Sequence, residues 1–241
     1  MQGNGRVRAS AAQPRWFVFL LFLTCLNSAA GAGTEASLYA FRSDLARPHD
    51  RVVLILPGQG RTTTAPEYQT IGDSYARKGI TPVYVEIHWQ EVGLNDLAAA
   101  AAQISAGARL SYPQARFCLF GFSFGAVIAA KVSEALPAEQ VLLCSMTPLL
   151  AGDLPYQVFP FRQVLHLLTI RARAPLEFAP NDGGRLVFLY GDSDSFLFNA
   201  AIIAHRQSIY PRSRTIIVPH ACHAMGAVYL AAIDQVVQEN P

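Results

Sequence analysis

Charged residues are scarce in this 241-residue chain, at 15% of the total, and cysteine is scarcer still, with four residues. So little charge beside 51% hydrophobic residues excludes an intrinsically disordered chain and predicts a well-buried interior. No repeat period is visible, and there is no low-complexity tract beyond one alanine-rich stretch. A single domain built around one core is therefore the expected organisation.

The N-terminal segment has the layout of a secretory signal peptide. Three arginines precede residue 16, an apolar run from Trp16 to Leu26 follows, and small residues then end in an Ala30-x-Ala32 cleavage pattern. The apolar run is too short to span a bilayer comfortably. We therefore predict a signal peptide at residues 1–32, a mature domain at 33–241, and export to the periplasm or secretion. An uncleaved N-terminal membrane anchor is the alternative.

The charge balance changes once this segment is set aside. The whole chain has 19 basic and 17 acidic residues, and three of the basic residues and none of the acidic ones precede Gly33. The mature chain therefore has 16 basic and 17 acidic residues, a net charge of −1. This balance indicates no nucleic-acid partner. Contact with a membrane is expected only during export or through an uncleaved N-terminal segment, and the oligomeric state is not predicted.

Three cysteines remain after residue 33, namely Cys118, Cys144 and Cys222. An odd number leaves at least one thiol free or paired between chains. Cys118 and Cys144 fall on two successive expected strands, where small buried core residues are the favoured interpretation. A disulfide between them is the alternative, because an exported protein can form one.

Apolar runs that end in glycine or proline alternate with segments of helical character along most of the chain. Strands are expected at 37–42, 51–56, 82–87, 116–120, 140–145, 185–191 and 214–218, and helices at 68–78, 97–110, 124–136, 158–170, 196–210 and 227–237. This alternation predicts an α/β fold with right-handed βαβ units, a mostly parallel central sheet and helices on both faces.

The central motif is Gly121-Phe122-Ser123-Phe124-Gly125, which stands between an expected strand and an expected helix. In that context Gly-x-Ser-x-Gly predicts a nucleophile elbow, a sharp turn that presents the serine hydroxyl at its apex. The turn is so tight that side chains at the two glycine positions would collide with neighbouring backbone. This arrangement resembles the alpha/beta hydrolase superfamily, over roughly residue 51 to the C-terminus.

The resemblance implies the alpha/beta hydrolase fold and a catalytic serine, acid and histidine in that chain order. Ser123 is the expected nucleophile. Asp192 and Asp194 both follow a strand that ends at Gly191. The acid of this family commonly stands three residues after such a glycine, which favours Asp194, and Asp192 is the alternative that would instead cap the turn.

The histidine of the family usually follows a few small residues beyond the last strand and precedes a helix. His223 fits this position better than His220, which directly follows Pro219 and remains the alternative. His220, Cys222 and His223 also invite a zinc-site interpretation, but no further ligand pair has matching spacing. No metal and no cofactor are therefore expected.

Two backbone N–H groups are expected to form the oxyanion hole. One is that of Phe124, directly after the serine, and the other is that of Gln59 in the turn Gly58-Gln59-Gly60. Family members often begin the latter loop with His-Gly. Pro57 replaces that histidine here, and the backbone role survives the change.

The resemblance implies hydrolysis of a small-molecule carboxylic ester or thioester through an acyl-enzyme intermediate. Amide or carbon–carbon bond cleavage by the same triad is one alternative, and a non-catalytic binding protein of the same fold is another. Residues 146–184, where cap insertions occur in the family, leave room for a short cap or lid at most. Phe122 and Phe124 either line an apolar acyl pocket, together with Phe159 and Phe161, or belong to the core.

Overall fold

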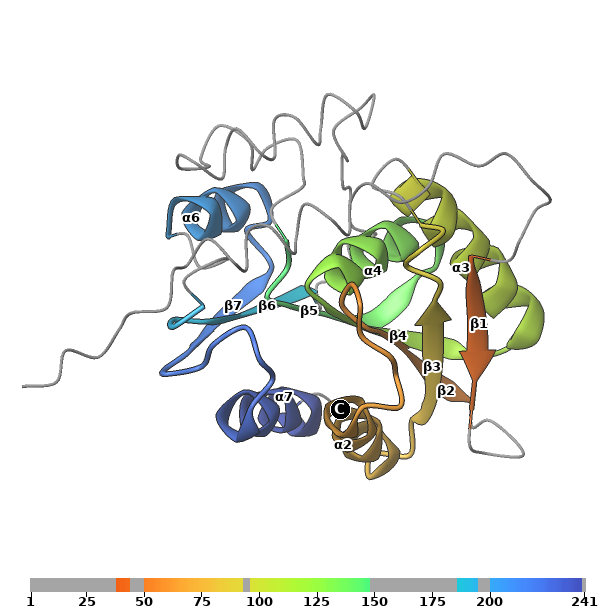
Figure 1. Cartoon of the computed structure of the whole chain (residues 1–241), viewed down its shortest axis with the longest axis horizontal. Coiled ribbons are helices and arrows are strands. Elements are labelled where there is room, and N and C mark those ends of the chain that lie inside the picture. The colour runs from red at the N-terminus through yellow and green to blue at the C-terminus, as the bar shows by residue number, and fades with distance from the viewer. Residues whose placement is uncertain (1–37, 44–49, 93–95, 148–185, 195–199, 240–241) are drawn as a thin grey trace, which may run out of the picture.

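A seven-stranded sheet forms the centre of the protein, in the strand order β1-β3-β2-β4-β5-β6-β7 (Figure 1). The structure is a computed structural model that describes residues 38–43, 50–92, 96–147, 186–194 and 200–239. Only β1 runs antiparallel to its neighbour, β3, and all other neighbouring strands are parallel. The strands are β1 (Tyr39–Arg42), β2 (Arg51–Leu56), β3 (Thr81–Ile87), β4 (Arg116–Phe122), β5 (Ala138–Cys144), β6 (Leu186–Gly191) and β7 (Arg214–Val218).

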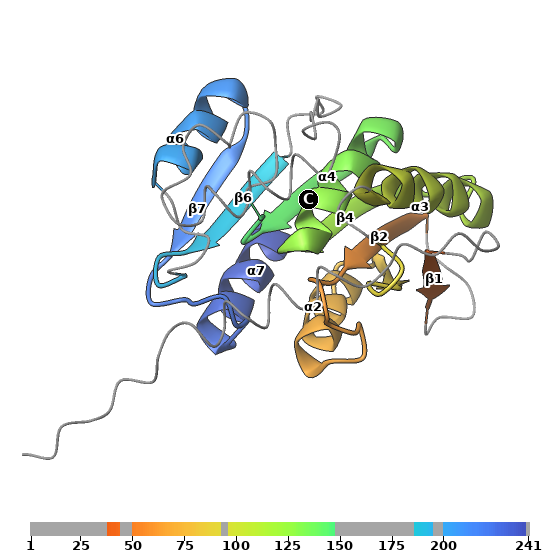
Figure 2. The same ribbon diagram turned by 45° about the horizontal axis from the view of Figure 1, so that its top comes forward.

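Helices cover both faces of this sheet. One face carries α2 and α7, and the other carries α3, α4 and α6 (Figures 1 and 2). Their bounds are α2 (Pro66–Ala76), α3 (Leu97–Ser111), α4 (Phe124–Ala135), α6 (Ala200–Ile209) and α7 (Ala227–Glu239). The predicted α/β architecture, a mostly parallel sheet with helices on both faces, is confirmed.

Strand β2 shows why helices cover both faces of the sheet. Its side chains alternate between two clusters, with Val52, Leu54 and Leu56 packed towards α3 and α4. Val53 and Ile55 pack towards α2 and α7. All five are fully buried. A strand that buries both faces must be apolar at every position, which is why the interior strands read as continuous hydrophobic runs.

The boundaries differ from the sequence-based expectations by one to three residues at several places. Helix α2 begins two residues before the predicted position 68, with Pro66 in its first turn, where the missing N–H costs nothing. Strand β5 begins directly after Pro137 rather than at position 140. The predicted signal peptide at 1–32, the predicted helix at 158–170 and nearly all of the segment 146–184 lie outside the described residues.

The two cysteines of the sheet are free and buried. Cys118 on β4 lies opposite Gln140, whereas Cys144 on β5 lies opposite Phe122. The two cysteines are therefore offset by four positions, about 13 Å along the strands, which is too far for a disulfide. Burial also raises the pKa of the Cys144 thiol well above its usual value. Both side chains serve as small core residues.

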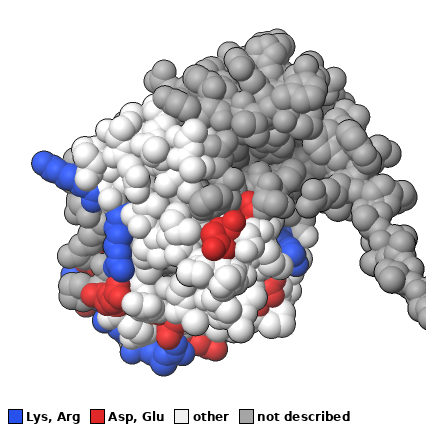
Figure 3. Space-filling view, turned by 90° about the vertical axis from the view of Figure 1, so that its left-hand side faces the viewer, with Lys and Arg blue, Asp and Glu red and all other residues white. Residues whose placement is uncertain are grey.

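The described face of the molecule beyond β7 is largely uncharged, with a few basic and acidic side chains scattered over it (Figure 3). Basic and acidic side chains also pair at the surface of the described residues, in the ion pairs Arg77–Asp234, Arg116–Glu139 and Arg214–Glu239. Within the described ranges no helix is long and apolar enough to cross a bilayer.

The cysteine environments predict selective thiol labelling of protein that lacks residues 1–32. Cys222 is exposed and should react with Ellman's reagent at pH 8, giving one thiol per chain in the native state. Cys118 and Cys144 should react only after unfolding in guanidinium chloride, raising the count to three. Cys222→Ser should abolish the native signal; a native count above one in the parent protein would contradict the burial of the sheet cysteines.

Candidate active site

Ser123 occupies a strained turn between β4 and α4. Its backbone has φ 55° and ψ −118°, a conformation that costs a non-glycine residue about 1–3 kcal/mol. Two hydrogen bonds hold the turn: Ser123 N–H donates to the Cys144 carbonyl at 2.9 Å, and Ala126 N–H donates to the Ser123 carbonyl at 3.1 Å. The first turn of α4 begins at the next residue, so the positive end of the helix dipole lies beside the serine.

Both flanking glycines are required by close backbone contacts. A Cβ atom at Gly121 would lie 2.5 Å from Ala126 Cα. At Gly125 it would lie 2.3 Å and 2.4 Å from the carbonyl oxygens of Pro57 and Leu56. Since these obstacles are backbone atoms, no rotamer change could make room. The sequence motif therefore has the steric basis that was predicted for it.

The loop after β2 lies against the serine. A Cβ atom at Gly58 would come within 3.3 Å of Ser123 Cβ. Gly58 to Arg61 form a β-turn closed by a 3.1 Å hydrogen bond from Arg61 N–H to the Gly58 carbonyl, with Gly60 at φ +71°. Positive φ at this third position is typical of a type II turn. Gln59, the predicted oxyanion residue, is the second residue of the turn and is half-buried.

Asp194 and His223 are joined directly. Asp194 Oδ2 lies 2.9 Å from His223 Nδ1, with the carboxylate side chain only 1% exposed and the imidazole 41% exposed. The acid is held in a tight turn by its own N–H, which donates to the Gly191 carbonyl at 3.2 Å. With the Nδ1 proton directed to the carboxylate, Nε2 is left as a hydrogen-bond acceptor.

Asp192 and His220 have a different arrangement. Asp192 Oδ1 accepts hydrogen bonds from the His220 backbone N–H at 2.7 Å and from the Ser193 hydroxyl at 2.9 Å. His220 itself is exposed and has φ 59°. The carboxylate of Asp192 thus caps a left-handed turn and ties the β6 loop to the β7 loop.

Aromatic contacts connect His223 to the serine turn. Its ring lies 5.0 Å, centroid to centroid, from the ring of Phe122, the residue before Ser123. Among the described residues, the hydroxyl of Ser123 hydrogen-bonds to Thr147 Oγ1 at 3.3 Å and not to His223. His223 therefore packs against the serine turn through Phe122, and no hydrogen bond joins its ring to the Ser123 hydroxyl in this conformation.

Comparison with solved structures places this arrangement in a known fold. An alpha/beta serine hydrolase homologue from Coxiella burnetii matches with a TM-score of 0.59 and 14% identity, covering 84% of this chain and 91% of that one. Est1E from Butyrivibrio proteoclasticus, with ferulic acid bound, matches with a TM-score of 0.62 and 10% identity over 83% and 92%. An alpha/beta serine hydrolase without lid from Xanthomonas campestris matches with a TM-score of 0.56 and 14% identity over 84% and 86%.

This chain has the alpha/beta hydrolase fold. No protein-family model matches the sequence, and no curated protein matches it either. At these low identities the likeness concerns the fold. The chemistry of the site depends on the residues that this chain places there.

Sequence reasoning missed Thr147 and Tyr229. Thr147 follows β5 by three residues and contacts Ser123 twice, through its hydroxyl and through its N–H, which donates to the Ser123 carbonyl at 3.4 Å. Tyr229 on α7 meets the Phe122 ring edge-on at 6.1 Å and hydrogen-bonds to Ser145 and to the Leu189 carbonyl, each at 2.9 Å. The sequence around Thr147 and Tyr229 contains no motif that predicts a role at the site, because both residues form their contacts with strand ends that are distant in the sequence.

Phe122 and Phe124 are core residues to a large extent. They are 4% and 3% exposed. Phe122 packs between His223 and Tyr229, and Phe124 meets the Trp89 ring edge-on at 6.5 Å. The core interpretation of these two aromatics is thus favoured over an open acyl pocket. Phe159 and Phe161 lie outside the described residues.

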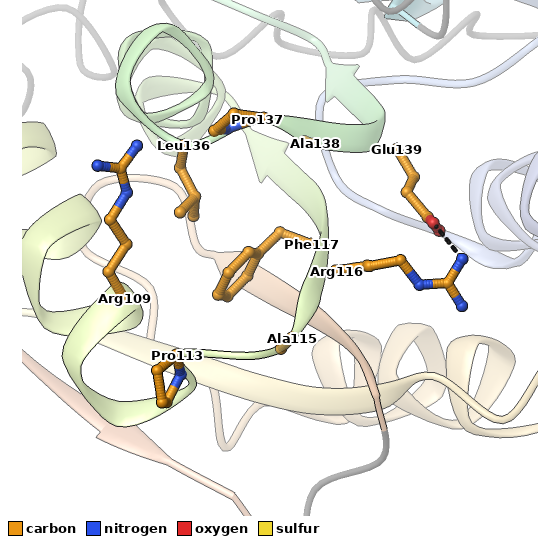
Figure 4. Close-up of a pocket in the computed structure, with 9 residues that line it drawn as sticks. All are labelled: Arg109, Pro113, Ala115, Arg116, Phe117, Leu136, Pro137, Ala138 and Glu139. Carbon is orange, nitrogen blue, oxygen red and sulfur yellow. Dashed lines mark hydrogen bonds and ion pairs between the residues drawn. The ribbon is translucent and has the colours of Figure 1, made fainter.

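A hollow of about 570 Å³ lies elsewhere, beside the first residues of β4 and β5 (Figure 4). The ring of Phe117 points into it, and Arg109 and Leu136 line another side. Arg116 is paired with Glu139 at 2.8 Å at its rim. Ser123 follows the opposite, carboxyl end of β4, where the catalytic groups of such sheets gather. The hollow contains no serine, histidine or cysteine among its lining residues.

In the described parts of the chain, no three His, Cys, Asp or Glu side chains are grouped so that they could hold a metal ion. The carboxylates and imidazoles near Ser123 are instead engaged in pairs, Asp194 with His223 and Asp192 with the His220 backbone.

The glycine contacts predict a large difference between two alanine substitutions. Gly125→Ala should destabilise the protein by about 1–3 kcal/mol or more, because the new methyl group meets fixed carbonyl oxygens. Gly226→Ala is the matched control, since among the described residues its methyl group would meet one atom, at 3.9 Å, and it should stay within about 0.5 kcal/mol. Thermal unfolding of both variants measures this. Equal melting temperatures would contradict the close approach of β2 and α4.

Proposed function

We propose that this protein is a serine hydrolase that cleaves carboxylic esters or thioesters through an acyl-enzyme intermediate. The observation that carries the proposal is the 2.9 Å hydrogen bond between buried Asp194 and His223, beside the strained turn of Ser123. A buried carboxylate bonded to one imidazole nitrogen orients the ring and stabilises its protonated form. The other nitrogen can then accept the proton of a serine hydroxyl, which is a weak nucleophile on its own.

In the proposed reaction, Ser123 Oγ attacks the carbonyl carbon of the substrate while His223 Nε2 accepts the hydroxyl proton. The tetrahedral intermediate collapses, and the protonated imidazole gives that proton to the departing alcohol or thiol. A water molecule then repeats the sequence on the acyl-enzyme, which releases the carboxylic acid and restores Ser123. Asp194 accepts the hydrogen bond from His223 Nδ1–H throughout and keeps the imidazole oriented.

The negative charge of each tetrahedral intermediate develops on the carbonyl oxygen. Two backbone N–H groups are proposed to receive it, those of Gln59 and Phe124. The position of Gly58 against Ser123 supports the first, and the start of α4 directly after the serine supports the second. One such donor is typically worth about 2.7–4 kcal/mol of transition-state stabilisation.

The hydrogen bond between Ser123 and Thr147 gives the resting state of the proposed nucleophile. Attack requires the hydroxyl to leave Thr147 and to point at His223 Nε2, and we propose that a rotation about the Cα–Cβ bond of Ser123 makes this change. Catalytic hydrogen bonds are often long or unformed before substrate binds and tighten in the complex. The neighbouring position of the His223 ring, against Phe122, is compatible with that change.

The nucleophile is tested with a fluorophosphonate probe and with p-nitrophenyl esters of graded chain length. The parent protein should be labelled and should turn over at least one ester, whereas Ser123→Ala should lose labelling and reduce kcat at least about 10³-fold. Thr147→Ser is the matched control, because it alters a hydroxyl residue in contact with Ser123 and preserves the hydroxyl group.

Equal labelling of the parent protein and Ser123→Ala would refute the assignment of the nucleophile. Labelling of Ser123 without turnover of any ester would favour an amide or carbon–carbon substrate on the same triad. Absence of both labelling and turnover would favour a non-catalytic binding protein.

The acid and the base are tested by two matched pairs of asparagine variants. Asp194→Asn should lower kcat by about 10⁴-fold, because an amide stabilises the wrong imidazole tautomer. Asp192→Asn keeps an oxygen that can accept the His220 N–H and should change kcat less than about tenfold. His223→Asn should approach the inactivity of Ser123→Ala, whereas His220→Asn suits the left-handed φ of 59° and should remain active.

Steady-state kinetics on the best ester measures all four variants, with melting temperatures as the check on folding. A larger loss in Asp192→Asn than in Asp194→Asn, or in His220→Asn than in His223→Asn, would overturn the corresponding assignment.

A further inference from the structure

The loop between β2 and α2 (Figure 1) carries Gln59 and is held to the rest of the protein by side-chain hydrogen bonds at two points. The later point is Thr63, which is fully buried although it is a polar loop residue. Its N–H donates to both carboxylate oxygens of Glu86 on β3, at 3.2 Å and 3.3 Å, and its hydroxyl donates to the same carboxylate. Its carbonyl accepts the Gln69 side-chain amide at 2.6 Å.

The earlier point is Gly58, whose N–H donates to the phenol oxygen of Tyr68 at 3.0 Å. Tyr68 lies on α2 and is fully buried. On its other side Gly58 faces the serine turn, where a Cβ atom would lie 3.3 Å from Ser123 Cβ and 3.2 Å from the Phe122 ring. The Tyr68 hydroxyl therefore binds the first residue of the turn, and the serine turn lies on the other side of that residue.

These bonds take up three of the six backbone N–H groups from Gly58 to Thr63. The Gly58 N–H is taken by Tyr68, that of Arg61 by the Gly58 carbonyl, and that of Thr63 by Glu86. Among the described residues, the N–H groups of Gln59, Gly60 and Thr62 have no acceptor, and only that of Gln59 belongs to a half-buried residue, since Gly60 and Thr62 are exposed. A buried or half-buried backbone donor without a partner is uncommon and calls for an acceptor, such as a ligand oxygen.

We propose that Tyr68 is a positioning residue, whose hydroxyl binds the Gly58 N–H and thereby aims the Gln59 N–H at the substrate carbonyl oxygen, with Thr63 and Glu86 as the second anchor of the same loop. This inference rests on the proposed hydrolase function and extends it to residues outside the triad. Tyr68 acts through the backbone and does not touch the substrate.

The hydroxyl is well suited to this role. Burial raises the pKa of Tyr68 well above its usual value, so the phenol stays neutral throughout the pH range of an assay. A neutral hydroxyl accepts the Gly58 N–H without placing a negative charge next to a developing oxyanion. Phenylalanine would fill the same space and leave the Gly58 N–H buried without an acceptor, which favours a shift of the turn.

The test compares Tyr68→Phe with Tyr75→Phe. Both tyrosines lie on α2 and are fully buried, and the Tyr75 hydroxyl bonds to Gln140, away from the loop, at 3.4 Å. Loosening an oxyanion donor affects the transition state more than the bound substrate. Tyr68→Phe should therefore lower kcat on the best ester by about 10–100-fold with KM changed less than about threefold, while Tyr75→Phe keeps the parent kcat.

A second variant pair addresses the other anchor and guards against misfolding of Tyr68→Phe. Thr63→Val should lower kcat in the same way as Tyr68→Phe, and Thr63→Ser should restore it, because serine retains the hydroxyl bound by Glu86. Hydrogen exchange of residues 57–63 gives a readout independent of activity: it should quicken in Tyr68→Phe and Thr63→Val but not in Tyr75→Phe.

The outcomes separate this inference from the proposed function. A parent protein without ester turnover and without fluorophosphonate labelling would refute the hydrolase proposal itself. An active parent whose kcat and loop exchange are the same in Tyr68→Phe and Tyr75→Phe would refute the positioning role alone. A rise in KM with unchanged kcat would also refute it, because it would assign Tyr68 to substrate binding.

Discussion

The close approach of two backbones at the carboxyl end of the sheet is the constraint on which the rest of the site depends. The first turn of α4 lies so near to the end of β2 that the carbonyl oxygens of Leu56 and Pro57 occupy the space of a side chain at Gly125. The chain can pass from β4 into α4 this tightly only if Ser123 adopts positive φ. The energetic cost of that conformation is met by the buried strands and helices on either side.

Four loops meet at the carboxyl end of the sheet. Strands β2 and β4 are neighbours in register, so the loop after β2 lies beside the serine. Strands β6 and β7 are neighbours as well, which allows Asp192 to tie their loops together and Asp194 to meet His223. The ring of Phe122, before the serine turn, packs against the rings of His223 and Tyr229, which follow β7. The result is a small set of polar groups whose geometry is set by strand ends rather than by flexible side chains.

Much of this could be predicted from the sequence, for definite physical reasons. Interior parallel strands are apolar at every position, so β2, β4 and β6 stand out, and polar residues just beyond them share one edge of the sheet. That made Ser123, Asp194 and His223 candidates. The antiparallel direction of β1 was not predicted, because a four-residue edge strand carries too little pattern. Tyr68 and Thr147 were missed because a hydroxyl that binds a distant backbone or side-chain group leaves no local signature.

The pairing of α2 with α7 has a consequence for the order of assembly. Arg77, just after α2, forms an ion pair at 2.6 Å with Asp234 on α7, 157 residues later, and side chains of both helices fill the same cluster. The layer formed by α2 and α7 therefore cannot be completed until α7 has left the ribosome. In the opposite layer α3 and α4 come much earlier in the chain, and α6 with Ile203 joins them later but still before α7. Synthesis thus supplies one hydrophobic layer before the other, and the last helix also brings Tyr229 to Phe122.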